Sequence, residues 1–453
     1  MFVKLTASVE FIIDKLNASG YEAYAVGGCV RDSLLGIVPK DWDICTSAMP
    51  HEIMNVFDGQ KIIPTGLQHG TVTLMLDNMP FELTTYRIDG LYSDNRHPDR
   101  VNFVNSLHDD LKRRDFTINA MAFNYQTGLV DLFGGKSDLA NKILRCVGDP
   151  DTRFKEDALR IFRALRFSSV YDFTIDNDTA VAMNNNKELL CNISPERLYN
   201  ELKKFIIGDN VERLLIDFRS ILAQIIPQLQ PMFDFKQYNP YHCYDVWTHT
   251  VKSVAAAPKD DIIRLTMLFH DIGKPSTFFR DEKGVGHFYG HSGVSKNIAQ
   301  QILSNLRVDN HTGKVVLLLV EIHDIPIEAT TKAVGKRLAK IGEENFRRLL
   351  IVKKCDAMGQ DKEVRKSKLQ YLQRIEDTLN VVLTENHCFS IKDLHINGND
   401  IISLGAAQGE RIGRVLQRLF EMVIDEQISN NHTVLIREAK KLLRTNFLPE
   451  NNI

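Results

Sequence analysis

The stretch from Ala25 to Ser47, AVGGCVRDSLLGIVPKDWDICTS, constrains the fold more than any other part of the chain. An apolar run ends at Gly27-Gly28, a short helical segment is expected from Val30 to Leu35, and the chain then reaches Asp41-Trp42-Asp43. Side chains alternate between the two faces of a strand, so the two aspartates point the same way. Neighbouring carboxylates repel unless a divalent cation joins them, and the stretch therefore predicts a metal site.

The residues around the two aspartates indicate which metal and which chemistry. Hard oxygen ligands favour Mg²⁺, which takes one or two carboxylates and completes its shell with water and substrate phosphates. The Gly28 backbone allows close approach of a phosphate, and Arg31 can clamp one. A bare Asp-X-Asp is more often a turn or an exposed strand edge, but the Gly-Gly and the arginine at matched spacing favour function. Phosphoryl transfer is the predicted chemistry.

The same stretch resembles the first motif, GGxVRDxLLGxxxxDxD, of the class II nucleotidyltransferases, which include tRNA CCA-adding enzymes and bacterial poly(A) polymerases. The resemblance implies an α/β nucleotidyltransferase head, polymerase-β-like, followed by all-α neck, body, HD and tail domains. The expected boundaries are 1–145 for the head, 146–235 for the neck and body with a base-reading helix, 236–360 for the HD domain and 361–453 for an RNA-binding tail.

Composition sets outer limits on the function. The 453 residues predict about three domains, and a formal net charge of −2 means that RNA contacts must come from local basic patches. The seven cysteines include no CxxC pair, which predicts reduced side chains and a cytoplasmic protein. No apolar run approaches the length of a membrane span.

Further strands are expected in the head at Ala23–Val26, Gly70–Leu76, Phe81–Tyr86 and Ala122–Asn124. Glu82 opens the third of these and is either a third metal-binding carboxylate or a solvent-facing strand residue. The polar segment 87–103 lacks periodicity and predicts a functional loop. In CCA-adding relatives a flexible loop at this place helps the site change from C to A addition.

The segment Leu111–Ala120 resembles the family motif RRDFTINA. The resemblance implies that Arg114 binds the triphosphate and that Asp115 or Asn119 holds the ribose hydroxyls.

The segment Phe154–Phe167 predicts a helix that reads the base. On a helix, each step of three residues falls about 60° short of a full turn. Asp157, Arg160 and Arg163 are therefore expected to share one face of the helix, and Arg166 to lie on nearly the opposite side. A carboxylate accepts from the amino group of cytosine or adenine while a guanidinium donates to the ring nitrogen, and uracil and guanine mismatch both contacts. The plainer alternative is an ion pair between Asp157 and Arg160. The family's EDxxR motif carries the base-reading role, Arg163 would reach a phosphate or the primer end, and Arg166 is either structural or nucleotide-binding.

A second chemical unit follows. Histidines and aspartates around a literal HDxGK, with Lys274 as a phosphate contact, resemble the metal centre of HD phosphohydrolases. Imidazole with carboxylate suits a transition metal such as Mn, Ni, Fe or Zn, and a metal-activated water hydrolyses a phosphoester. The expected ligands are His249, His270, Asp271, His291, His323 and Asp356.

These observations predict a tRNA nucleotidyltransferase that rebuilds the 3′ CCA end from CTP and ATP, with tRNA as partner and no membrane. Three alternatives stay open: an enzyme that adds only the terminal A, a bacterial poly(A) polymerase, and an HD phosphohydrolase whose head only binds RNA. A small-molecule nucleotidyltransferase would not need the long helical tail.

Overall fold

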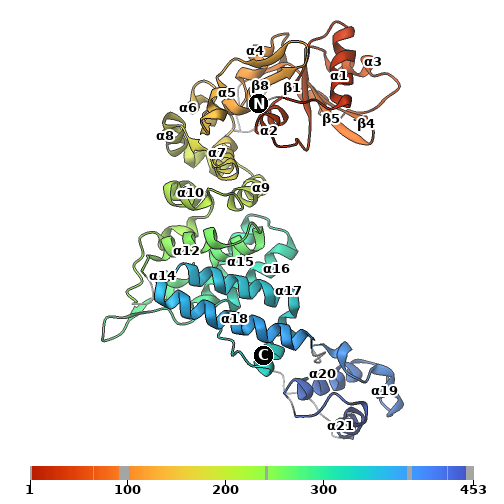
Figure 1. Cartoon of the computed structure of the whole chain (residues 1–453), viewed down its shortest axis with the longest axis vertical. Coiled ribbons are helices and arrows are strands. Elements are labelled where there is room, and N and C mark those ends of the chain that lie inside the picture. Colours follow the sequence, from red (N-terminus) through yellow and green to blue (C-terminus); the bar gives the residue numbers. More distant parts are fainter. Residues whose placement is uncertain are drawn as a thin grey trace. The chain divides into compact units, whose positions relative to one another are not determined.

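The computed structural model describes residues 3–64, 66–90, 101–239, 243–384, 390–425 and 427–444. The chain divides into two compact units, Met1–Gln230 with Gln301–Val308, and Pro231–Gln300 with Asp309–Ile453 (Figure 1). The boundaries expected at 146, 236 and 361 are finer than this division and stay predictions.

The first unit begins with a mixed seven-stranded sheet in the order β3-β4-β5-β2-β1-β8-β9. β2 and β5 run parallel, and the other neighbouring pairs run antiparallel. The expected strands are all present within a residue or two of their predicted ends. The sheet strands are β1 (Ala23–Val26), β2 (Asp43–Thr46), β3 (Lys61–Ile63), β4 (Thr71–Leu76), β5 (Met79–Thr85), β8 (Met121–Asn124) and β9 (Gly128–Asp131).

Short helices cover this sheet because each presents one apolar face. The opening helix α1 buries Val9, Ile12, Ile13 and Leu16, the helical spacing that the sequence shows. It packs with α3 on the sheet (Figure 1). The helices of this part are α1 (Ala7–Ala18), α2 (Gly28–Leu34), α3 (Pro50–Val56), α4 (Leu107–Lys112) and α5 (Gly135–Ala140).

The described ends of the expected loop at 87–103 form strands. Its two ends pair as the antiparallel strands β6 (Arg87–Asp89) and β7 (Val101–Phe103), with Arg87 opposite Phe103. Two three-residue strands lack the length for a readable period-2 pattern, which is why the sequence did not predict them. Residues 91–100, the centre of the predicted loop, lie outside the described residues.

The rest of the first unit is mainly helical. The predicted helix across Phe154–Phe167 is two helices, because Asp157 ends the first in an extended conformation (φ −134°, ψ 103°). The helix that follows Ser194 begins with Pro195 in its first turn, and the Ser194 side chain makes no capping bond. The remaining elements are α6 (Pro150–Glu156), α7 (Leu159–Tyr171), α8 (Asn177–Asn186), α9 (Pro195–Ile206), α10 (Val211–Asp217), α11 (Arg219–Ile225), and the short strands β10 (Ile143–Leu144) and β11 (Thr174–Ile175).

The second unit is almost entirely helical, with one hairpin. Helices α12, α13, α16 and α17 pack on one another, and a separate apolar cluster built around Ile401, Leu419 and Leu435 holds its C-terminal helices together. The elements are α12 (Val246–Ala256), α13 (Asp261–Phe269), α14 (Lys274–Thr277), β12 (Phe279–Arg280), β13 (Gly286–His287), α15 (His291–Asn305, whose last turn belongs to the first unit), α16 (Asn310–Ile322), α17 (Thr331–Met358), α18 (Lys362–Thr384), α19 (Gly398–Ser403), α20 (Glu410–Ile424) and α21 (His432–Arg444).

Among the described helices, none combines the length and the apolar character that a bilayer crossing requires. The described cysteines are unpaired thiols, and four of them, Cys29, Cys45, Cys146 and Cys355, are buried.

Candidate nucleotide site and metal cluster

A turn between β1 and α2 opens the first candidate site. Gly27 has φ +78°, a conformation that side-chain-bearing residues rarely adopt. A Cβ at this position would lie 3.0 Å from Nη1 of Arg114. Glycine is therefore needed here both for the backbone angle and for the approach of the arginine. Gly28, the expected phosphate contact, lines the same pocket.

Asp43 lines this pocket, and the carboxylates of Asp41 and Glu82 are close enough to act on its charge. β2 begins only at Asp43, so Asp41 lies just before the strand, but the burial pattern still alternates: Asp41 and Asp43 are exposed and Trp42 between them is buried. Asp43 pairs in register with Glu82 on β5. The protein around Asp43 desolvates its carboxylate and raises its pKa, and the charges of Glu82 and Asp41 raise it further. A cation beside these carboxylates would relieve that repulsion.

The head carboxylates do not by themselves complete a coordination shell. In the part of the chain that the structure describes, the groups of three ligand atoms lying within 4.8 Å of one another are both in the second unit. Asp41 and Asp43 nevertheless fit Mg²⁺, because this ion commonly takes one or two carboxylates and fills its other positions with water and substrate phosphates.

The pocket has a volume of about 500 Å³ and a strongly basic wall. Pockets of this size hold ligands as large as a nucleotide. Arg166 lines it beside Arg163, so the expectation that Arg166 faces nearly the opposite way is wrong. That expectation counted the helical phase from Asp157, which lies before α7 begins. The predicted residues in the lining are Gly28, Arg31, Asp43, Arg114, Asp115, Asn119, Arg163 and Arg166.

Arg31 is held by three partners rather than left free for a phosphate. Its Nη1 donates to Asn119 Oδ1 at 2.6 Å, its Nη2 donates to Tyr171 Oη at 2.7 Å, and its Nε donates to Asp32 Oδ1 at 2.9 Å. The guanidinium also stacks over the Tyr171 ring, 4.7 Å from its centroid. Arg31 therefore joins α2 to the far end of α7 across the pocket.

Asp115 is equally engaged. Its Oδ2 accepts from Nε of Arg163 at 2.9 Å, and its Oδ1 accepts from the side-chain amide of Asn119 at 3.0 Å. Although burial opposes its ionisation, the Arg163 charge and these hydrogen bonds hold the pKa of Asp115 well below its usual range. The carboxylate is therefore ionised and oriented before any substrate arrives.

The proposed base-reading pair has other partners. Arg160 donates to Glu156 Oε2 at 2.6 Å, and Asp157 pairs with Nη2 of Arg197 at 3.3 Å. Because α6 ends before Asp157, the two side chains reach different partners, Arg197 and Glu156. Neither residue is in the lining of the 500 Å³ pocket.

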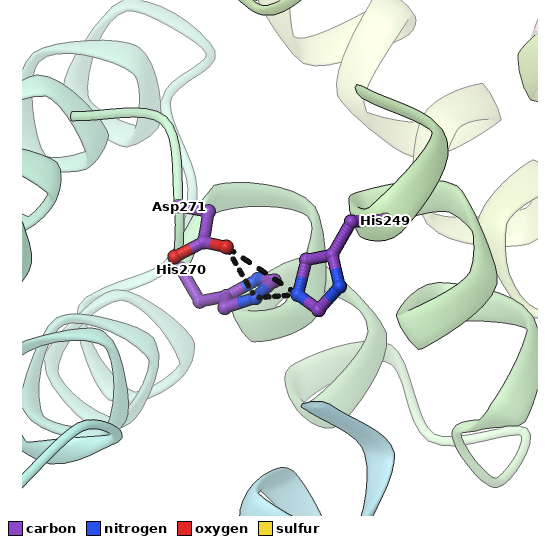
Figure 2. A group of neighbouring side chains, drawn as sticks. All are labelled: His249, His270 and Asp271. Atoms are coloured by element: carbon purple, nitrogen blue, oxygen red, sulfur yellow. Dashed lines mark hydrogen bonds and ion pairs between the residues drawn. The ribbon is translucent and has the colours of Figure 1, made fainter. Parts of the chain in front are cut away.

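A second site lies in the second unit, where six predicted residues from five segments converge. His249 is on α12, His270 and Asp271 follow α13, His291 opens α15, His323 ends α16 and Asp356 lies near the end of α17. Figure 2 shows the rings of His249 and His270 turned toward each other beside the Asp271 carboxylate. Asp271 is 2 % exposed, so this charge is fully buried.

The hydrogen bonds of the four histidines show what the cluster is built to hold. Each Nδ1 lies 2.7–2.9 Å from a backbone carbonyl, and since a carbonyl only accepts, each Nδ1 carries the proton. In the neutral rings each Nε2 then carries a lone pair. These Nε2 atoms face each other at 3.3 Å in the pairs His249–His270 and His291–His323. Facing lone pairs repel unless a cation lies between or beside them. The donor set therefore fits metal ions.

Asp271 divides its two oxygens between the histidine pairs. Oδ2 lies 3.2 Å from His270 Nε2, and Oδ1 lies 3.3 Å from His291 Nε2. Asp356 adds an oxygen 3.0 Å from His249 Nε2. Although burial opposes a charge on His270, the Asp271 and Asp356 carboxylates raise its pKa, so in place of a metal ion its Nε2 can hold a proton. The cluster thus offers two ligand groups that share Asp271.

Glycine and lysine complete the surroundings. A Cβ at Gly359 would lie 2.5 Å from Nδ1 of His249, so only glycine lets the 359 carbonyl accept that hydrogen bond. Lys274 lies 2.7 Å from Asp271 Oδ2, and Lys368 lies 3.2 Å from Asp356 Oδ2. Both lysines line a pocket that opens on the cluster.

Comparison with known proteins decides the family. Three regions match family descriptions: "Poly A polymerase head domain" over residues 23–145, "Probable RNA and SrmB- binding site of polymerase A" over 172–233, and tRNA nucleotidyltransferase domain 2 over 283–439. The CCA-adding enzyme of Ligilactobacillus salivarius is 32% identical over 441 residues, which are 95% of each chain. The chain belongs to the CCA-adding enzymes.

Other CCA-adding enzymes agree with this assignment. The enzyme of Pediococcus pentosaceus is 32% identical over 95% of this chain and 96% of its own. The crystal structure of the Bacillus stearothermophilus CCA-adding enzyme in complex with CTP superimposes with a TM-score of 0.68 at 27% identity, covering 96% of this chain and 97% of that one. The Thermotoga maritima enzyme complexed with tRNA, at 19% identity and a TM-score of 0.60, shares the fold.

Sequence reasoning missed several residues that shape these two sites in this CCA-adding enzyme. Glu156 stands four positions before Arg160, a helical ion-pair spacing that could have been read from the sequence. Tyr171, Arg197 and Lys368 reach their partners only through tertiary contacts, and no local pattern points to them.

Proposed function

We propose that this chain adds C and A, from CTP and ATP, to the 3′ end of tRNA and so rebuilds the CCA terminus. The supporting observation is the basic pocket in which Asp43, Gly28, Arg114 and Arg163 gather, in a chain that matches CCA-adding enzymes over 95% of its length. A cytoplasmic location follows from the proposed substrate and the unpaired cysteines.

Within this proposal Asp41 and Asp43 hold Mg²⁺, with Glu82 as an additional carboxylate. When bound, the ion would supply charge stabilisation as the primer's 3′ hydroxyl attacks the α-phosphate of the nucleotide and pyrophosphate departs. The protein's own groups position the reactants: Arg114 and Arg163 bind phosphates, Arg31 orders Asn119 and Tyr171 around them, and the ionised Asp115 fixes Arg163.

Base selection is assigned to Asp157 and Arg160. Because these residues now pair with Arg197 and Glu156, an incoming base must compete with those partners for the carboxylate and the guanidinium. Cytosine and adenine replace both contacts, whereas uracil and guanine leave them mismatched.

Three tRNA transcripts, lacking one, two or all three terminal nucleotides, test the proposal with labelled CTP and ATP. Three additions followed by a stop indicate CCA synthesis. A long ladder of A would identify a poly(A) polymerase, and addition only to tRNA ending in CC would identify an A-adding enzyme; either result would contradict the proposal.

A second activity, metal-dependent phosphoester hydrolysis, is favoured by one observation: four histidine Nε2 atoms form two ligand groups that share the buried Asp271, with Asp356 and two lysines beside them. When bound, a transition metal there supplies the activation of water and ester that hydrolysis needs. Lys274 and Lys368 would neutralise the phosphate.

Two variants separate the activities. Asp41→Asn should abolish nucleotide addition and leave hydrolysis intact, and Asp271→Asn should do the reverse. Loss of hydrolysis in Asp41→Asn, or its persistence in Asp271→Asn, would show that the cluster is not the hydrolytic site.

A further inference from the structure

One aromatic side chain in the wall of the nucleotide pocket has arginines around it. The guanidinium carbons of Arg166, Arg31 and Arg163 lie 4.1, 5.1 and 5.4 Å from the ring centroid of Phe167 on α7. Each distance is within the roughly 6 Å over which the face of an aromatic ring attracts a cation. Phe167 and these arginines all line the same pocket of about 500 Å³. The ring is therefore a neighbour that the basic groups of α2 and α7 share.

Charge repulsion opposes this arrangement of arginines. Burial lowers the pKa of Arg166, although the charge of Glu201 opposes the shift. The charges of Arg163 and Arg31 lower it further, so the guanidiniums are close enough to repel one another. One carboxylate lies beside each guanidinium, in the pairs Arg31–Asp32 at 2.8 Å, Arg163–Asp115 at 2.5 Å and Arg166–Glu201 at 3.0 Å. A group that attracts all of the guanidiniums offsets the rest of the repulsion.

Neighbouring rings fix the orientation of Phe167. The fully buried Phe116 packs edge to face against it, with centroids 5.7 Å apart and planes 80° apart. Tyr171 stacks on it at 6.1 Å with an angle of 21° between the planes. Phe167 is only 6% exposed, so an incoming base cannot stack on its ring. Any effect of this ring on a nucleotide must therefore act through the arginines.

We propose that Phe167 is a positioning residue for the nucleotide triphosphate, and that its ring gathers the guanidiniums at the pocket wall before the substrate arrives. The inference rests on the nucleotide addition proposed above and adds a residue that acts on that site through its arginines. Without the attraction of the ring the guanidiniums separate, and the triphosphate then spends binding free energy on bringing them together. This gathering helps the bound substrate and the transition state equally, so its loss raises KM and leaves kcat unchanged.

Fluorination of the ring tests this role with little change in packing. Phenylalanines that carry one, two or three ring fluorines keep the shape of the side chain at position 167 and successively withdraw the electron density that attracts a cation. The dissociation constant of CTP, measured by equilibrium dialysis with Mg²⁺ on the full chain, should rise with each fluorine, by about fivefold in the trifluoro variant. The KM for CTP in single addition to tRNA lacking CCA should rise by the same factor, with kcat unchanged.

Phe162 supplies the matched control. It lies on the same helix, is fully buried, and packs edge to face against Phe205 with centroids 5.7 Å apart. The same fluorines at position 162 should leave the dissociation constant and the KM for CTP unchanged. Thermal melting checks that both series remain folded. The variant with one fluorine is the smallest change, and it shows the direction of the effect even if the trifluoro ring destabilises the fold.

The outcomes separate this role from the proposed function. CTP binding that weakens with the number of fluorines at position 167, in a chain that adds no nucleotide to tRNA, would support the role of Phe167 and refute nucleotide addition. Nucleotide addition whose KM and dissociation constant for CTP do not depend on fluorination, or change equally at position 162, would support the proposed function and refute the role of Phe167.

Discussion

Replacing Asp157 by asparagine tests whether a single carboxylate excludes the wrong base. Asparagine is almost the same size and keeps one oxygen, which can still accept from the backbone N–H of Leu159 or from Arg197. Asp157 now accepts from these two donors with different oxygens, at 3.1 and 3.3 Å. The fold should therefore survive. The amide also offers an N–H donor, which suits the O4 of uracil, and the charged mismatch that rejects UTP disappears.

The size of the effect follows from the site. The Asp157 side chain is 18% exposed, so a mismatched carboxylate is only partly rehydrated. A buried charged group without a matching partner costs about 2 kcal/mol, which is about a 30-fold change in selectivity. We expect the ratio of kcat/KM for CTP over UTP to fall by about that factor in Asp157→Asn.

The assay is single-nucleotide addition to tRNA lacking CCA, with each nucleotide supplied alone. Asp178→Asn, the same change at an exposed position on α8, is the control and should leave the ratio unchanged. Thermal melting checks the fold. An unchanged CTP-to-UTP ratio in a stably folded Asp157→Asn protein would refute base reading by this carboxylate.

Three further outcomes are expected. Gly27→Ala and Gly20→Ala both place a side chain at positive φ, so each should lower the free energy of unfolding by about 1 kcal/mol, measured by chemical denaturation. Only Gly27→Ala should impair nucleotide addition, because only its Cβ meets a pocket arginine at 3.0 Å. Asp115 has a lowered pKa in the folded protein, so it stabilises the fold fully above pH 3.8, and this stabilisation is lost as the pH falls. Arg163→Ala should raise the pKa of Asp115. Acid unfolding, followed by circular dichroism, should therefore occur at higher pH in this variant. His291→Ala should reduce the metal content of the Mn-loaded protein from two ions per chain to one, because the two ligand groups share only Asp271. Mass spectrometry measures this content. An unchanged content would contradict the division of the cluster into two ligand groups.

Local sequence determined the elements of the head and the chemistry of its first motif. The run from β1 through Gly27-Gly28 to Asp43 is contiguous, so its turn, short helix and strand follow from backbone preferences and alternation. The opening helix and four of the sheet strands could likewise be predicted, because apolar spacing along one segment directly reflects which face is buried. The order of the histidines and aspartates along the chain was enough to propose the six cluster residues. It could not predict which oxygen of Asp271 lies next to which histidine.

Tertiary structure alone decided how these residues are used. Asp157 pairs with Arg197 on α9, a partner 40 residues away that no local pattern indicates. Three of the four Nδ1 hydrogen bonds go to carbonyls three residues earlier in the chain, whereas the bond of His249 depends on the carbonyl of Gly359, which the fold brings to it. Periodicity reports which face of an element is buried, whereas the pairing of charges and the direction of a ring depend on neighbours that the chain brings together only when it folds.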